Sequence, residues 1–479
     1  MIGGGSTVLR QAQDPEDRGK GPELVEGPRT DYWAENAFLP TGWARGVKLT
    51  EQDGRWIKII TDQPPGSAHR LPGAILPGFA NCHSHAFHRA LRGRTHALRQ
   101  ARGSSGRPDN FWTWRTAMYE AADRLDPDSY LDLARATYAE MALSGITAVG
   151  EFHYLHHGPG GVPYADPNEM AAALRQAAAE AGIRLTLLDT CYLAGGLGAG
   201  GHQPLEGPQL RFGDGDAAGW ATRVAGLRAD DNTRIGAAIH SVRAVPRDQL
   251  RTVAAAADDR PLHVHLSEQP AENQACKNFY GPTPTGLLAG EGVLGKQTTA
   301  VHATHLEPDD LVLLGSSGTT ACICPSTEAD LADGIGPARA LADAGAPLSL
   351  GTDQHAMIDF LAEARGLELH ERLNSGQRGR FGPTELINAA AAHGSIGWPD
   401  AGRLEVGARA DLVAIRTDTP RTAGSMCEQV IMSATAQDVH TVIAGGQVIV
   451  DDHQHRLGDI GRALSEAIDP LWSSTRSTR

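Results

Sequence analysis

The chain has 479 residues, 41% hydrophobic and 21% charged, which is enough for one large domain and a smaller one. Its formal net charge of −14 and the lack of a basic stripe argue against nucleic acid and anionic membranes as partners. The six cysteines form no CxxC pair, no run approaches the roughly 18 apolar residues of a membrane helix, and the start lacks a signal-peptide core, so we expect a reduced, cytoplasmic setting.

The first segments of the chain differ in character. Residues 1–30 are rich in glycine, proline and charge and show no apolar period, so we predict a disordered extension that lies outside the fold. Residues 31–76 read as short strands. Within them, GVKLT and RWIKIIT bracket Asp53–Gly54, a dipeptide typical of a two-residue hairpin turn. We therefore predict that the folded part begins with a small β-rich unit.

The central residues 77–395 alternate short apolar runs with alanine-rich helical stretches such as EMAAALRQAAAEAG. This alternation favours an α/β fold, a TIM-like (β/α)8 barrel. A doubly wound sheet is the alternative, but no glycine-rich phosphate turn follows the first run. The expected strands are AILPGFANCHSH, ITAVGEF, RLTLLDT, RIGAAIH, LHVHLSE, TAVHAT, TTACICP and PLSLGTD.

Beyond the barrel the pattern returns to strands. Residues 396–460 contain GRLEVGARADLVAIR and HTVIAGGQVIVDD, which carry the apolar residues of β-strands. Because this segment and residues 31–76 flank the barrel and are both β-rich, we predict that they pair into one small β-sandwich domain. Residues 461–479 are expected to form a C-terminal helix or tail.

Side chains that bind metals stand at the ends of several expected strands. His83 and His85 close the first strand, and residues two apart in a strand point to the same side. His265 lies on the fifth strand, His302 ends the sixth and Asp353 ends the eighth. Active sites of such barrels lie at the carboxyl ends of the strands, and zinc takes nitrogen and oxygen ligands. The sequence therefore predicts a metal site at this end of the barrel.

These motifs also resemble a known family. PGFANCHSH, HLSE, HATH and GTD resemble the amidohydrolase superfamily, in its branch of mononuclear-zinc deaminases, and GRLEVGARADLVAI resembles the β segment that follows its barrel. The more specific segments FWTWR, GEFHYLHH, IHSVRAV and CPSTEADLADG are similar to the formimidoylglutamate deiminases of that superfamily, which act in histidine degradation. The resemblance covers residues 31–460.

The resemblance implies a ligand set and a reaction. It makes His83, His85, His265 and Asp353 the ligands of one Zn²⁺, for which Fe²⁺ or Mn²⁺ could substitute. It makes Glu268 and His302, together with Asp353, the catalytic side chains that hydrolyse a formimidoyl C–N bond and release ammonia. Binuclear members usually carry a bridging carboxylated lysine on a middle strand. No lysine lies between residues 58 and 277, which favours one metal per chain.

The implied substrate is a small amidine with two carboxylates, which call for arginine or tyrosine side chains at the pocket. By resemblance, its contacts are His88, Arg115, Tyr154, His240 and Arg243. His88 stands where such relatives often have glutamine. The family also implies a homodimer.

Two other functions stay open from the sequence. A sibling deaminase or chlorohydrolase acting on a heterocyclic base would share the ligands but would need aromatic stacking surfaces. A metal-containing binding protein that has lost catalysis is the other, and the intact Glu268 and His302 argue against it. Of the remaining histidines, we interpret His153 and His156 as structural and His263 as a bonded core residue.

Overall fold

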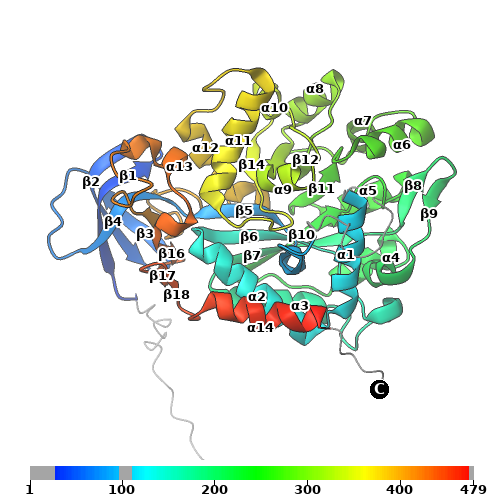
Figure 1. Ribbon diagram of the computed structural model, residues 1–479, viewed down its shortest axis with the longest axis horizontal. Coiled ribbons are helices and arrows are strands. Elements are labelled where there is room, and N and C mark those ends of the chain that lie inside the picture. The colour runs from blue at the N-terminus through cyan, green and yellow to red at the C-terminus, as the bar shows by residue number, and fades with distance from the viewer. Residues whose placement is uncertain (1–26, 96–110, 474–479) are drawn as a thin grey trace, which may run out of the picture.

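The computed structural model describes residues 27–95 and 111–473. The extension predicted over residues 1–30 thus lies outside the described residues up to position 26, and the chain enters its first strand at Thr30. A β-rich unit lies to one side of a larger unit in which strands are surrounded by helices (Figure 1). None of the helices in the described ranges is long and apolar enough to span a bilayer.

The eight predicted barrel strands form one parallel sheet in the order β14-β13-β12-β11-β10-β7-β6-β5. Its two edges meet where Ser84 bridges Asp353 in parallel register. The amide of His85 donates to the carbonyl of Asp353 at 3.2 Å, and the amide of Asp353 donates to His83 at 3.0 Å. The predicted (β/α)8 fold class is thereby confirmed. The strands are β5 (Phe79–Ser84), β6 (Ile146–His153), β7 (Arg184–Cys191), β10 (Thr233–Ile239), β11 (Leu262–Leu266), β12 (Thr298–His302), β13 (Thr320–Ile323) and β14 (Leu348–Leu350).

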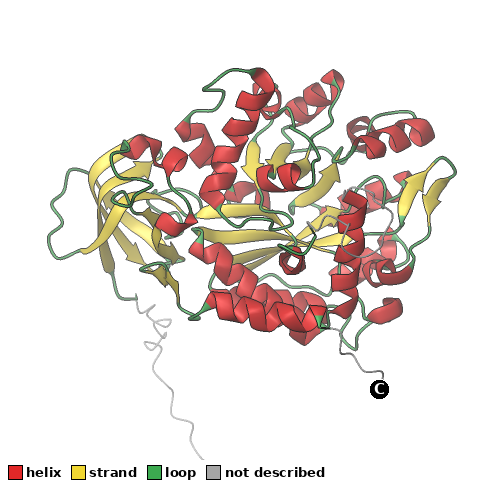
Figure 2. Cartoon of the chain, viewed as in Figure 1, coloured by secondary structure: helices red, strands yellow, loops and turns green. Residues whose placement is uncertain are grey.

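Helices connect the barrel strands and lie around them (Figure 2). Local sequence signals set where they begin: Asp126 accepts from the amide of Ser129 at 2.9 Å, and Pro127 occupies the first position of its helix. The helices of the barrel region are α1 (Phe111–Arg124), α2 (Pro127–Leu143), α3 (Glu169–Ala181), α4 (Ala217–Val224), α5 (Arg247–Ala257), α6 (Pro270–Tyr280), α7 (Pro284–Gly290), α8 (Pro308–Ser317), α9 (Pro325–Asp330), α10 (Ala338–Asp343), α11 (Phe360–Ser375) and α12 (Pro383–Ala390). A small hairpin, β8 (Gly196–Gly198) and β9 (Gly201–Gln203), follows β7.

The N- and C-terminal β segments pair with each other, as predicted, in a mixed sheet of order β18-β17-β16-β15-β4-β1-β2-β3. The joint is antiparallel, with Leu412 of β15 opposite Pro77 of β4. Asp53 and Gly54 form the predicted hairpin turn with φ of 52° and 76°, the left-handed backbone that this turn requires. The strands are β1 (Thr30–Leu39), β2 (Gly42–Gln52), β3 (Arg55–Ile60), β4 (His69–Pro77), β15 (Leu412–Ile415), β16 (Val439–Ala444), β17 (Gln447–Asp451) and β18 (Gln454–His455).

The C-terminal part of the chain also contains two helices. The short helix α13 (Val430–Ser433) lies between β15 and β16, and α14 (Ile460–Trp472) ends the described chain. Ile460, Leu464, Ile468 and Leu471 are the buried residues of α14, which is the spacing of one apolar helix face. Figure 1 shows α14 running alongside α2. The predicted C-terminal helix therefore covers the outside of the barrel.

Candidate active site

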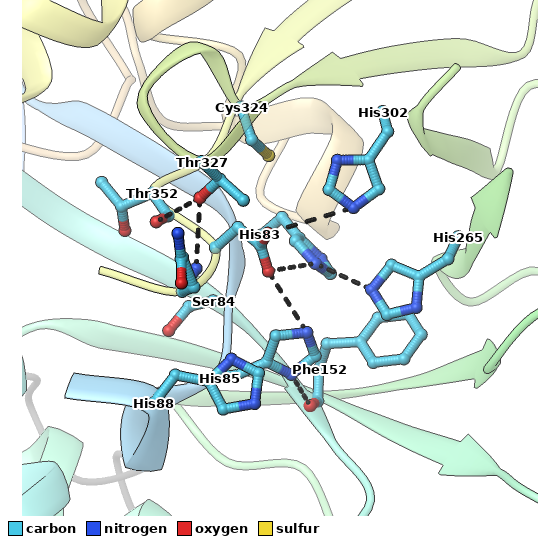
Figure 3. Close-up of polar contacts among 12 residues, drawn as sticks. His83, Ser84, His85, His88, Phe152, His265, His302, Cys324, Thr327 and Thr352 are labelled. Atoms are coloured by element: carbon cyan, nitrogen blue, oxygen red, sulfur yellow. Dashed lines mark hydrogen bonds and ion pairs between the residues drawn. The ribbon is translucent and has the colours of Figure 1, made fainter. Parts of the chain in front are cut away.

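The carboxyl ends of three barrel strands bring the four predicted metal-binding side chains together. His83 and His85 come from the end of β5, His265 from β11 and Asp353 from the loop after β14. Gly351 permits this approach, because a Cβ atom there would lie 2.7 Å from the Cβ of His83. The glycine of the LGTD segment therefore lets the last strand pack against the first, and Figure 3 shows the histidine rings facing one another.

The ligand atoms of this cluster lie close to one another inside the protein. Asp353 Oδ1 is 3.2 Å from His83 Nε2 and 3.4 Å from His85 Nε2. The Nε2 atoms of His83 and His265 are 3.1 Å apart. All four side chains are buried. Nitrogen and carboxylate oxygen atoms gathered around one point match the donor set that zinc prefers.

The protonation of the histidines also fits a cation. Burial lowers the pKa of His85 to about 3 and that of His83 and His265 well below the ordinary range, so the rings are neutral at pH 7. His85 Nδ1 lies 2.8 Å from the carbonyl oxygen of Phe152 and donates to it (Figure 3). This leaves the Nε2 lone pair facing Asp353. A carbonyl behind an imidazole orients the ring as a ligand, so the residues present fit a bound metal.

His302 adds an alternative to the predicted ligand set. His83, His265, His302 and Asp353 have ligand atoms within 4.8 Å of one another, as have His85, His88 and Asp353. The two groups share Asp353. His302 differs from His85 because carboxylates face both of its ring nitrogens rather than a backbone carbonyl.

His302 lies between acidic side chains. Its Nε2 is 4.0 Å from Glu268 Oε1 and 4.0 Å from Asp353 Oδ2, and its Nδ1 is 3.6 Å from Glu328 Oε1. Burial lowers the pKa of His302, but these three carboxylates outweigh burial and raise it to about 10. Glu328, on α9, was not singled out from the sequence, although it lies in the CPSTEADLADG segment.

Backbone strain gathers at these strand ends. The left-handed region holds Ser267, His302, Ala303 and Asp353, with φ of 50°, 68°, 50° and 42°. Residues with a side chain rarely adopt this backbone, and such strain is typical of functional sites. The surrounding barrel therefore holds His302 and Asp353 in conformations that an isolated strand would not keep.

A cavity opens onto the cluster, and all five predicted substrate contacts line it. Arg115 reaches it from α1, Tyr154 from the end of β6, and His240 and Arg243 from the segment after β10. The sequence did not predict most of the aromatic side chains that line this cavity. The residues lining the cavity are His85, His88, Trp114, Arg115, Met118, Tyr119, Tyr154, Tyr192, Phe212, His240, Arg243, His265, Glu268, His302, Leu331 and Asp353.

The two cavity arginines are held in place differently. Arg115 Nε donates to the hydroxyl of Tyr119 at 2.5 Å, and its Nη2 donates to the carbonyl of Gly195 at 3.2 Å. Arg243 Nη2 instead donates to Glu268 Oε2 at 2.9 Å. These two contacts of Arg115 are with neutral oxygens, whereas Arg243 already pairs with a carboxylate.

Two of the remaining histidines contact backbone carbonyls. His156 Nε2 contacts the carbonyl of Thr190 at 2.9 Å, and His263 Nε2 contacts that of Ser395 at 3.0 Å. His153 and His156 come near Asp189. Asp189 is already occupied, because it accepts two hydrogen bonds from Arg223 at 2.8 and 2.9 Å.

Known proteins share this arrangement. Residues 74–449 match the model of the amidohydrolase family. The chain is 38% identical over 442 residues to formimidoylglutamate deiminase of Pseudomonas aeruginosa, across 88% of this chain and 95% of that relative. It is 28% identical over 440 residues to 8-oxoguanine deaminase of the same organism, across 88% and 94%.

Solved structures agree with the sequence relatives. An amidohydrolase from Brucella melitensis superposes with a TM-score of 0.85 at 31% identity, over 93% of this chain and 100% of that one. An adenosine deaminase from Xanthomonas campestris with bound zinc has a TM-score of 0.77 at 20% identity, over 92% and 98%, and supports the fold alone. From the family match, these relatives and the buried His/Asp cluster at the barrel mouth, we conclude that the chain belongs to the amidohydrolase family.

Proposed function

We propose that this amidohydrolase is a deiminase that hydrolyses N-formimidoyl-L-glutamate to N-formyl-L-glutamate and ammonia. One observation carries the proposal: Arg115 and Arg243 line the same cavity as the His/Asp cluster. Guanidinium groups are the usual partners of carboxylates, and two of them suit a substrate with two carboxylates. The similarity to formimidoylglutamate deiminase of Pseudomonas aeruginosa supports the same substrate.

We propose one Zn²⁺ per chain, held by His83, His85, His265 and Asp353. When bound, zinc lowers the pKa of a coordinated water toward neutrality and so supplies a nucleophile. His85 is preferred over His302 as the fourth ligand because the carbonyl of Phe152 fixes its ring, whereas His302 lies within 4.0 Å of Glu268.

The side chains around the cluster can move the protons that the reaction requires. Asp353 accepts a proton from the attacking water, and Glu268 delivers a proton to the nitrogen that leaves. His302, flanked by carboxylates, donates a hydrogen bond to the oxygen on which charge develops. A C–O bond forms and the C–NH₂ bond breaks, so the oxygen of water remains in the formyl product and ammonia departs.

A second function has one specific observation in its favour. Trp114, Tyr119, Tyr192 and Phe212 line the cavity, and aromatic rings could stack on a heterocyclic base. A base, however, carries no carboxylate for the two arginines to bind. We therefore retain the deamination of a heterocyclic base, or chlorohydrolysis of one, as the alternative.

The test is ammonia release from N-formimidoyl-L-glutamate by zinc-loaded protein, measured with a coupled assay. Turnover of this substrate and no turnover of purines or pterins is expected. Turnover of a purine or pterin without turnover of the formimidoyl compound would contradict the proposal. Arg243→Met sharpens the result, because kcat/KM should collapse for the dicarboxylate and change little for a base.

A further inference from the structure

Glu272, on α6, is a buried carboxylate that the proposed reaction leaves without a role. It is 1% exposed, and its Oε2 lies 3.4 Å from Nε of Arg243. Burial and the nearby Glu268 carboxylate raise the pKa of Glu272 to about 7, although Arg243 opposes them. A carboxylate removed from water is costly unless a cation faces it. Arg243 is the cation beside Glu272.

Arg243 thus stands between two carboxylates on different sides. Glu268 lines the catalytic cavity and accepts from Nη2 at 2.9 Å. Glu272 lines an adjoining cavity, whose wall also includes Arg243. The guanidinium therefore has one carboxylate partner on the wall of the catalytic cavity and one on the wall of the adjoining cavity.

Charge makes this arrangement unfavourable for a third anion. The guanidinium already faces the carboxyl groups of Glu268 and Glu272, so a substrate carboxylate at the same group would add a third acidic group. Like charges close together in a poorly solvated site repel strongly. An incoming carboxylate is therefore favoured if it takes the place of one resident carboxylate. Glu268 lines the cavity that holds the His/Asp cluster, whereas Glu272 lines the adjoining one.

We infer that Arg243 exchanges partners when substrate binds: the substrate carboxylate replaces Glu268 on the guanidinium, while Glu272 acts as a positioning residue that holds Arg243 toward the cavity. The inference rests on the proposed function, because it requires a carboxylate in the substrate. While Arg243 holds Glu268 Oε2, that oxygen is not available to carry a proton to the amidine. A substrate without a carboxylate then leaves Glu268 bound to Arg243. The carboxylate of the substrate therefore increases the rate of the reaction as well as the affinity.

Turnover of a carboxylate-free amidine tests the exchange. In zinc-loaded Arg243→Met, Glu268 is no longer held, so kcat/KM for N-propylformamidine should rise about tenfold or more, the usual effect of losing one charged hydrogen bond. Arg247→Met is the matched control, since Arg247 pairs with Glu291 away from the cavity. If Arg243 only anchors substrate, its loss leaves N-propylformamidine turnover unchanged or lower, and the exchange is wrong. Should the single variant fail to fold, Arg243→Met/Glu272→Gln removes both charges and carries the same test.

Binding of glutarate, measured by calorimetry, tests the role of Glu272 without catalysis. Glu268→Gln frees the guanidinium and should tighten glutarate binding several-fold. Glu272→Gln also removes a negative charge, so simple electrostatics predicts tighter binding. Positioning predicts the opposite sign: binding about tenfold weaker, because the guanidinium loses its support. Glu272→Asp, which keeps the charge, should recover part of the loss.

The outcomes separate the two proposals. Equal or tighter glutarate binding by Glu272→Gln overturns the positioning role, whatever the enzyme hydrolyses. Formimidoylglutamate turnover by the unchanged enzyme, without any gain for Arg243→Met on N-propylformamidine, overturns the exchange and leaves the proposed function intact. Failure of the unchanged enzyme to hydrolyse formimidoylglutamate overturns the proposed function itself.

Discussion

The Nε2 atom of His88 lies 2.9 Å from the hydroxyl oxygen of Tyr154 at the wall of the catalytic cavity. His88 lies in the 3-10 turn Ala86–Leu91 after β5, and Tyr154 follows β6, so this hydrogen bond joins the ends of adjacent strands. Both side chains are buried, and a buried hydroxyl needs a partner. The two residues therefore position each other in the wall of the cavity.

We expect Tyr154→Phe to raise KM about tenfold, because the substrate loses a contact and His88 Nε2 loses its partner. His88→Gln should stay within about threefold of the unchanged enzyme, since an amide can replace the ring as the hydrogen-bond partner. Steady-state kinetics on N-formimidoyl-L-glutamate measure both. A larger loss in His88→Gln than in Tyr154→Phe would contradict this mutual positioning.

In free-energy terms, the loss of kcat/KM in the combined variant His88→Ala/Tyr154→Phe should be smaller than the sum of the losses in the two single variants. Residues joined by one hydrogen bond couple by about 1 kcal/mol in a double-mutant cycle. Strict additivity would mean that the two side chains act independently on the substrate.

Glu268→Gln should lower kcat about 10²- to 10⁴-fold, the usual contribution of a general acid or base. The amount of bound metal should not change, because Glu268 is not in the proposed ligand set. Rapid kinetics and elemental analysis of the same sample separate these two effects. Glu307→Gln, an exposed carboxylate paired with Lys277, is the control and should keep full activity. Loss of metal together with activity would instead make Glu268 a ligand.

Elemental analysis of two histidine variants should decide between the overlapping groups around Asp353. His85→Asn should lose most of the bound metal at matched concentration, whereas His302→Asn should retain about one ion per chain and lose activity. The reason is that a carbonyl orients His85 from behind, while carboxylates surround His302. His440→Asn, on the outlying sheet, serves as the control. The reverse pattern would exchange the roles of the two histidines.

Glu363, on α11, makes part of the stability of the protein depend on pH. Burial raises the pKa of its carboxyl to about 8 from an ordinary 4.5, against the hydrogen bonds that Ser326 donates. The folded state therefore binds this proton more tightly than the unfolded state. Its stabilising contribution is complete below pH 4.5 and is lost as the pH rises through about 8.

Replacing Glu363 by glutamine should flatten this part of the pH profile. Between pH 5 and 8, we expect the free energy of unfolding of the unchanged protein to fall relative to the variant, by about 1 kcal/mol or more. Urea unfolding at several pH values measures the difference, and Glu180→Gln, at the surface, controls for charge. A constant difference across this range would show that Glu363 does not titrate in it.

Local pattern was sufficient for much of the fold. The alternation of apolar runs and helical stretches identified all eight barrel strands, because each run is a complete buried strand. Asp53–Gly54 marked its hairpin because few other residues tolerate positive φ at both turn positions. The spacing of His83 and His85 placed both rings on one side of a strand. These features depend on residues that are neighbours in the chain, and that is the information a sequence carries directly.

Tertiary structure decided the contacts between distant segments. The sequence determined that His83, His85, His265 and Asp353 stand at strand ends, but only closure of the barrel through Ser84 and Asp353 brings them to one point. The pairing of Arg243 with Glu272, the carboxylate of Glu328 behind His302, and the bond between His88 and Tyr154 left no mark in local pattern. Each depends on the angle at which separate loops leave the barrel, and packing of the whole chain sets that angle.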